Sequence, residues 1–114
     1  MDKDPLVFVG HVLEEIRVLN SIAADHTFMS FQANAIAYRA AIYAIQTISE
    51  AVRQLPDDIT GNHPPIPWHR IRAIGNHTRH EYYRLHEFVV WNIVTVELRP
   101  LEAIMISLNE TMRR

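Results

Sequence analysis

Apolar residues recur at intervals of three and four along three long stretches of the chain, and this spacing predicts three amphipathic helices. The first stretch covers about residues 4–23, and its opening Asp-Pro pair is typical of a helix start. The second covers about residues 30–55 and is stopped by Pro56. The third covers about residues 86–112 and contains Pro100, which should kink or split it.

The segments between these helices are shorter and more polar. Residues 56–67 hold four of the six prolines, which predicts a loop with room for one helical turn at residues 57–60. A short helix should follow from Trp68 to about Arg79, and we expect it to end near His80. No strand-like alternation is found, so the pattern predicts an all-α, up-and-down bundle of four to five helices.

Polar chemistry is concentrated around the end of the short helix. Four nitrogen-bearing side chains and two phenols fall within eight residues: Asn76, His77, Arg79, His80, Tyr82 and Tyr83. On a helix, Arg72, Asn76 and Arg79 lie one above another at i, i+4 and i+7. Such a stripe of two guanidinium groups and an amide suits a phosphate group.

The order of these residues resembles the motif of the HepT-like branch of the HEPN superfamily. That motif is Arg, Asn, three variable residues, His, one residue and Tyr, and Asn76, His80 and Tyr82 match it, whereas Gly75 stands in place of the Arg. The resemblance extends from Asp4 to about Leu108. Its further matches are Asp4-Pro5, Ser49-Glu50-Ala51, Arg53-Gln54-Leu55-Pro56, Ile66-Pro67-Trp68, Val90-Trp91, Leu98 and Pro100.

The resemblance implies a HEPN-like bundle that forms a homodimer and acts as the RNase toxin of a toxin–antitoxin pair. The implied antitoxin is a minimal nucleotidyltransferase, which in some members adds AMP groups to the Tyr at the position of Tyr82. The implied reaction is metal-independent cleavage of RNA, with His80 and Asn76 as catalytic residues. Because Gly75 removes a principal catalytic residue, the activity is expected to be weakened or lost. Arg72 and Arg79 are the nearest candidate phosphate-binding substitutes.

Each of these residues also has an ordinary structural explanation. His80 can interact with the helix dipole and the free carbonyls at a helix end, and Asn76 can make local hydrogen bonds. Arg72 and Arg79 can be solvated surface residues, and Tyr82 can pack against its neighbours. The alternative function is therefore a non-catalytic dimeric binding or interaction module of the same fold, with a nucleotide or a protein as its partner.

A metal site is a further alternative, because His77 and His80 are spaced as a helical pair and Glu81 follows them. A pair needs a third ligand and supporting hydrogen bonds, and surfaces rich in His are common. We therefore expect no bound metal and no cofactor.

Composition limits the remaining possibilities. The 114 residues are expected to form one domain, 1–114, and the net charge of −2 provides no overall basic field, so any contact with RNA must be local. Cysteine is absent from the sequence, which excludes disulfides. The first residues lack the features of a signal peptide, and no apolar run is long enough for a membrane span. We expect a soluble, cytoplasmic protein without a membrane partner.

Overall fold

The first helix begins at the predicted Asp-Pro pair. In the computed structural model, which describes residues 4–81 and 87–113 and the side chains among them except those of 75–81, helix α1 spans Pro5–Asp25. The Asp4 carboxylate accepts a hydrogen bond of 2.9 Å from the Leu6 amide. This bond satisfies one of the amides that have no partner within the helix.

The second predicted helix is interrupted near its start. The chain forms a short α2 (Phe28–Gln32) and then α3 (Ala35–Arg53), so the prediction of one continuous helix from residue 30 is wrong. The break is stabilised by a side-chain cap, because Asn34 Oδ1 accepts a hydrogen bond of 2.9 Å from the Ala37 amide. A separate α2 lets Phe31 enter the core, where its side chain is fully buried.

The proline-rich segment and the short polar helix follow the prediction closely. Helix α4 (Asp57–Thr60) is the expected single turn, and α5 spans Trp68–Glu81, so the predicted helix end near His80 falls at the limit of the described residues. The Trp68 indole donates a hydrogen bond of 3.0 Å to the His63 carbonyl. This bond ties the start of α5 to the preceding loop.

The last stretch is divided ahead of Pro100. It consists of α6 (Glu87–Asn92), a π-helical segment η2 (Ile93–Glu97) and α7 (Arg99–Met112). The Leu98 amide bonds to the Ile93 carbonyl five residues earlier, at 3.2 Å. Because the Leu98 amide bonds to Ile93, the Val94 carbonyl lacks the partner that an α-helix would give it. The Arg99 guanidinium bonds to one carbonyl in this region, that of Val94, at 3.0 Å.

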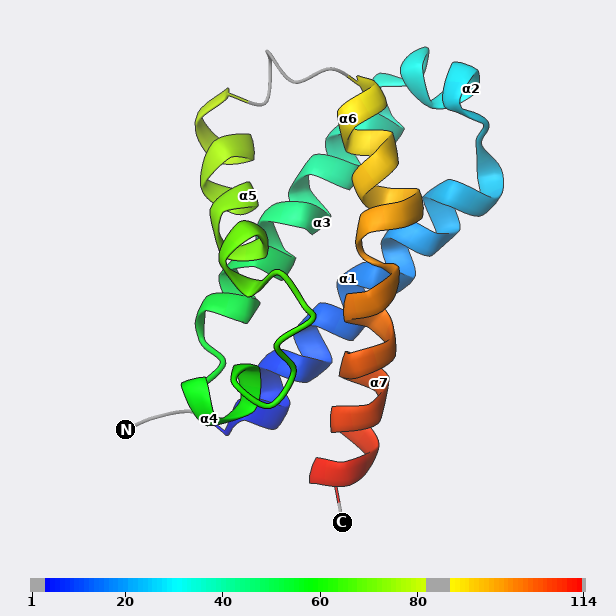
Figure 1. Ribbon diagram of the computed structural model, residues 1–114. Coiled ribbons are helices and arrows are strands. Elements are labelled where there is room, and N and C mark those ends of the chain that lie inside the picture. The colour runs from blue at the N-terminus through cyan, green and yellow to red at the C-terminus, as the bar shows by residue number, and fades with distance from the viewer. Residues whose placement is uncertain (1–3, 82–86, 114) are drawn as a thin grey trace.

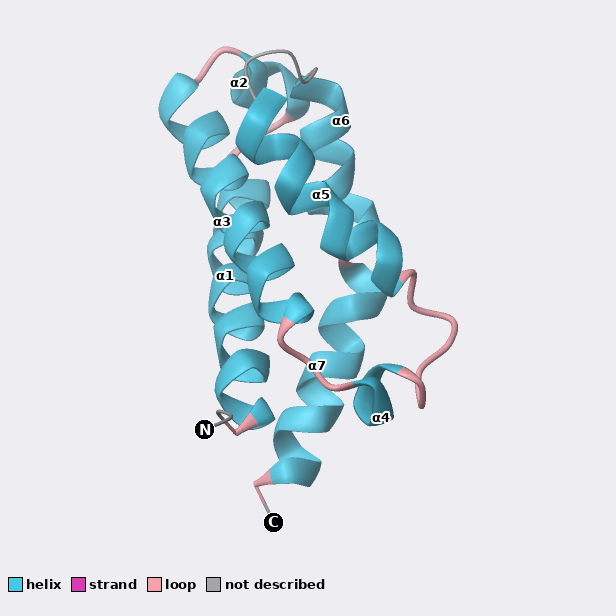
Figure 2. Cartoon of the chain, turned by 90° about the vertical axis from the view of Figure 1, so that its left-hand side faces the viewer, coloured by secondary structure: helices cyan, strands magenta, loops and turns pink. Residues whose placement is uncertain are grey.

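The elements assemble into an up-and-down bundle, as predicted (Figure 1). Helix α3 packs against α1 on one side and α5 on the other, while α7 packs against α1 and α2 against α6. Every element in the described ranges is helical (Figure 2). The core is apolar and draws on all the longer helices through Val9, Val12, Ile16, Leu19, Phe31, Ile45, Ile48, Val52, Trp68, Ile71, Val90, Val94, Leu101 and Met105. Among the described helices, none has both the length and the apolar content required to span a membrane.

The carboxyl group of Glu15 makes the stability of the bundle depend on pH. Partial burial, and to a lesser extent the neighbouring charge of Glu14, raises the pKa of Glu15. The folded state therefore favours the protonated form, and stability is lost as pH rises through the raised pKa. We expect Glu15→Gln to melt at a higher temperature than the natural protein near pH 7.

The difference should largely disappear at about pH 3.5, where an ordinary Glu side chain is mostly protonated in both the folded and the unfolded state. Thermal melts of the two proteins at both pH values test this, with Glu110→Gln on the exposed side of α7 as the control. A natural protein that is as stable as Glu15→Gln near neutral pH would contradict the prediction.

Candidate active site on helix α5

The motif residues lie on the second half of α5. The helix continues through Gly75 to Glu81, so the backbone positions of Arg72, Asn76 and Arg79 share one face as predicted. The structure describes only the backbone of residues 75–81, which include Gly75, Asn76, Arg79 and His80. Tyr82 lies outside the described residues. The catalytic and modification roles of these residues therefore remain predictions.

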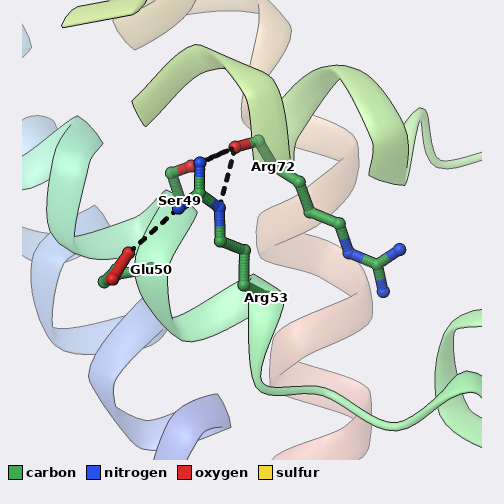
Figure 3. A network of polar contacts seen from close by, with 4 residues as sticks. All are labelled: Ser49, Glu50, Arg53 and Arg72. Carbon is green, nitrogen blue, oxygen red and sulfur yellow. Dashed lines mark hydrogen bonds and ion pairs between the residues drawn. The ribbon is translucent and has the colours of Figure 1, made fainter. Parts of the chain in front are cut away.

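Helix α5 is fixed to α3 one turn before the motif (Figure 3). The buried Ser49 hydroxyl donates a hydrogen bond of 2.9 Å to the Arg72 carbonyl. The Arg53 guanidinium donates two more to the same oxygen, from Nε at 3.2 Å and from Nη2 at 3.0 Å. Glu50 accepts from Arg53 Nη1 at 3.5 Å. A carbonyl held by three side-chain donors restricts both the sliding and the rotation of α5 on α3.

A second anchor joins α5 to the π-helical segment. The Arg70 guanidinium forms an ion pair with Oε1 of Glu97, and Oε2 of Glu97 accepts a hydrogen bond of 3.2 Å from Asn92. Asn92 and Glu97 are five residues apart, which is the spacing that a π-helix brings together. An exposed ion pair contributes only about 0–1 kcal/mol to stability, so its main effect is on orientation. The Glu97 carboxylate also offsets part of the Arg70 charge.

The side chain of Arg72 leaves α5 on the side away from Ser49 and Arg53 (Figure 3). Its Nε is buried and has no hydrogen-bond partner among the residues that the structure describes. Packing around Nε limits the movement of the side chain, so an anion would have to bind at the terminal nitrogens. The phosphate-binding role of Arg72 stays a prediction.

Arg53→Ala is expected to loosen α5 from α3. The change removes two hydrogen bonds to the Arg72 carbonyl, each of which contributes about 0.5–1.5 kcal/mol. Because Arg53 is partly exposed, we expect the free energy of unfolding to fall by about 1 kcal/mol and the melting temperature to fall by about 5 °C. Amide hydrogen exchange should accelerate in residues 68–81 more than in α1. Arg17→Ala, at an exposed position on α1, is the matched control. Unchanged exchange in α5 would contradict the anchoring role.

The sequence marked Ser49 and Arg53 as family matches but did not indicate that they hold the motif helix. A signal was present, since the two residues are four apart and share a helix face just before Pro56. Neither the target carbonyl at Arg72 nor the pairing of Arg70 with Glu97 could be read from spacing. In the described parts of the chain, no three His, Asp or Glu side chains come together as metal ligands would.

The fold and the place of the motif define a class: small helical bundles with an Asn and a His in the last two turns of one anchored helix. The sequence pattern of the ribonuclease HepT-like family matches residues 12–108, which is most of the chain. The protein therefore belongs to the ribonuclease HepT-like family.

Individual relatives agree with this assignment. The chain is 27% identical over 100 residues to a candidate RNase of Caldanaerobacter subterraneus subsp. tengcongensis, covering 88% of this chain and 89% of the relative. It is 28% identical over 92 residues to a candidate RNase of Methanocaldococcus jannaschii, covering 81% and 76%. It is 24% identical over 95 residues to a candidate ribonuclease HepT of Thermococcus cleftensis, covering 83% and 86%. No solved structure matches the chain significantly.

Proposed function

We propose that this protein is an RNase-toxin homologue that pairs with a minimal nucleotidyltransferase antitoxin and cleaves RNA without a metal, weakly or not at all. The observation that carries the proposal is the family's Asn and His spacing, at Asn76 and His80, on a helix that α3 anchors one turn earlier. The ribonuclease names of the relatives support RNA as the substrate.

The proposed chemistry is transfer of the RNA phosphate to the neighbouring ribose oxygen. The His80 imidazole removes the proton of the 2′-hydroxyl, or protonates the 5′-oxygen that leaves, since its ordinary pKa lies near neutrality. The 2′-oxygen forms a bond to phosphorus as the bond to the 5′-oxygen breaks, which yields a cyclic phosphate. Asn76 positions His80 or the phosphate. Arg72 and Arg79 are the candidate cations, because Gly75 supplies no charge.

The direct test is cleavage of labelled single-stranded RNA by the purified protein in the presence of a chelator. We expect slow cleavage or none, and any cleavage should leave cyclic phosphate ends and disappear in His80→Ala. Cleavage that persists in His80→Ala, or that requires a divalent metal, would refute the proposed mechanism.

The proposed pairing has a separate test. Incubation with ATP and a minimal nucleotidyltransferase encoded beside this protein should add AMP to the natural chain and not to Tyr82→Phe, as read by intact mass. Equal modification of both proteins would place the acceptor elsewhere. The absence of both modification and complex formation would remove the antitoxin from the proposal.

The alternative function is a dimeric binding module without catalysis, and the observation that favours it is Gly75 at the position of the family's Arg. Such a module keeps the bundle and its partner surface while the site no longer stabilises the charged transition state. The two functions differ in whether restoring the Arg restores cleavage.

We expect a symmetric homodimer whose interface is formed by α5 and by the last helical rod, which consists of α6, η2 and α7. Several large apolar side chains on that rod are exposed, among them Phe88 at 61% and Val96 at 57%. A specific interface buries about 1,200–2,000 Å² in total, which would cover these side chains. Light scattering at micromolar concentration should give the mass of a dimer, and Val96→Arg should shift it toward the monomer.

Met29→Arg is the control for the dimer, because Met29 is 79% exposed and lies on α2. A monomer at every concentration would refute the dimer. A dimer that persists in Val96→Arg would place the interface on another face.

A further inference from the structure

One exposed stripe of α3 contacts the site described above through its C-terminal residue, Arg53. Its residues alternate at three and four along the helix, so they share one face: Ile36, Arg39, Tyr43, Gln46, Glu50 and Arg53. We call this set the α3 stripe. Arg53 at its C-terminal end reaches the Arg72 carbonyl, so the stripe lies on the flank of α3 that borders α5.

The middle of the α3 stripe lies at the level of the motif. Helices α3 and α5 run in opposite directions (Figure 1), and the bond from Ser49 to the Arg72 carbonyl fixes their register. A helix advances about 1.5 Å per residue. Gln46, three residues before Ser49, and the backbone of Asn76, four residues after Arg72, are therefore at similar heights along the bundle.

A pocket of about 410 Å³ opens at this part of the stripe, and its described lining residues are Arg39, Ile42, Tyr43 and Gln46. Ile42 is 5% exposed and forms an apolar floor, whereas the Tyr43 side chain is 67% exposed. Arg53, Arg70 and Arg99 each pair with a Glu, but Arg39 forms no ion pair with any residue that the structure describes. The pocket thus combines an available cation, an exposed aromatic face and an amide.

We infer that this pocket is a subsite for single-stranded RNA that leads the strand to the last turns of α5, an inference that rests on the proposed function. Tyr43 stacks on an unpaired base, Arg39 holds the adjacent phosphate, and the Gln46 amide bonds to a base edge. Single-stranded RNA is bound by this combination of aromatic stacking and local positive charge. A local cation is required because the net charge of the protein is −2.

A second copy of the chain is the competing occupant of this surface. It would cover the exposed Ile36 side chain, but the hollow between Arg39 and Gln46 and its polar groups suit a ligand better than a closely packed apolar interface. The test below therefore measures both RNA affinity and oligomeric state.

The experiment is fluorescence anisotropy with a labelled single-stranded oligoribonucleotide of about ten nucleotides, within the usual site size of such proteins. We expect Tyr43→Ala to weaken binding about tenfold and Tyr43→Phe, which keeps the ring, to retain the natural affinity. Arg39→Gln should weaken binding and reduce the slope of log K against log salt by about 0.7, as expected for one lost phosphate contact. The matched controls are Arg17→Gln and Met29→Ala, which change exposed positions on α1 and α2.

The outcomes separate the subsite from the proposed function. RNA binding by the natural protein with unchanged affinity in Tyr43→Ala and Arg39→Gln would overturn the subsite alone. The absence of RNA binding by both the natural protein and Gly75→Arg would overturn the proposed function together with the subsite. Conversion of the dimer to a monomer by Tyr43→Ala would show that the stripe joins two copies of the chain, which also overturns the subsite.

Discussion

Gly75→Arg is expected to raise the rate of RNA cleavage by about 10²- to 10³-fold, the range associated with one group that stabilises charge in a transition state. In the arrangement that the family implies, the Arg at this position holds the phosphate while the His five residues later moves the proton. Gly75 also lies inside α5, where glycine costs about 1 kcal/mol of helix stability relative to alanine. Cleavage of labelled RNA under single-turnover conditions measures the gain.

Gly75→Ala is the matched control, because it restores helix propensity without adding a charge. If its rate rises as much as that of Gly75→Arg, the benefit comes from a stiffer helix. Rapid, His80-dependent cleavage by the natural protein would mean that another cation already replaces the Arg. No gain in a folded, dimeric Gly75→Arg variant would favour the binding module.

Phe31→Ala is expected to destabilise the fold by about 3–5 kcal/mol. The Phe31 side chain is fully buried, and its ring lies 5.1 Å from that of Trp91 and 6.0 Å from that of Tyr38, measured between centroids. Truncation removes buried apolar area and leaves a cavity where α2, α3 and α6 meet. Denaturant unfolding followed by circular dichroism measures the loss.

Phe28→Ala serves as the comparison for Phe31→Ala, since Phe28 is only half-buried and its ring contacts the exposed Phe88. We expect it to cost clearly less than Phe31→Ala. Similar small losses in both variants would mean that α2 contributes little to the core.

Helix boundaries were predictable where single residues determine them. The Asp-Pro pair marks the start of α1, and the prolines after Arg53 separate α3 from α5. The break between α2 and α3 was not predictable from spacing, because the three-and-four apolar pattern continues across it. The deciding interactions are the Asn34 cap and the burial of Phe31, and both depend on the surrounding helices.

The same distinction applies to the candidate site. The sequence identified Asn76 and His80 through a motif, and the helical backbone on which they lie follows from local pattern. The target of the anchors could not be predicted, because Ser49 and Arg53 bond to a backbone carbonyl that lies 23 and 19 residues further along the chain, in another helix. Every residue has a backbone carbonyl, so the residue type at position 72 does not indicate that its carbonyl is the acceptor.

The π-helical segment η2 changes the direction in which the side chains of the last helical rod point, so α6 and α7 face different parts of the bundle. A π-helix accommodates one more residue than an α-helix over the same bonded span, and each residue of an α-helix turns by about 100°. Side chains of α6 and α7 are therefore offset in angle by about one residue, so α6 can pack against α2 while α7 packs against α1. Loss of one residue within η2 would leave Asn92 and Glu97 four residues apart, a spacing that an α-helix also brings together, but it would rotate α7 by about 100° relative to α6. The packing of α7 on α1 thus depends on one extra residue in the segment that precedes α7.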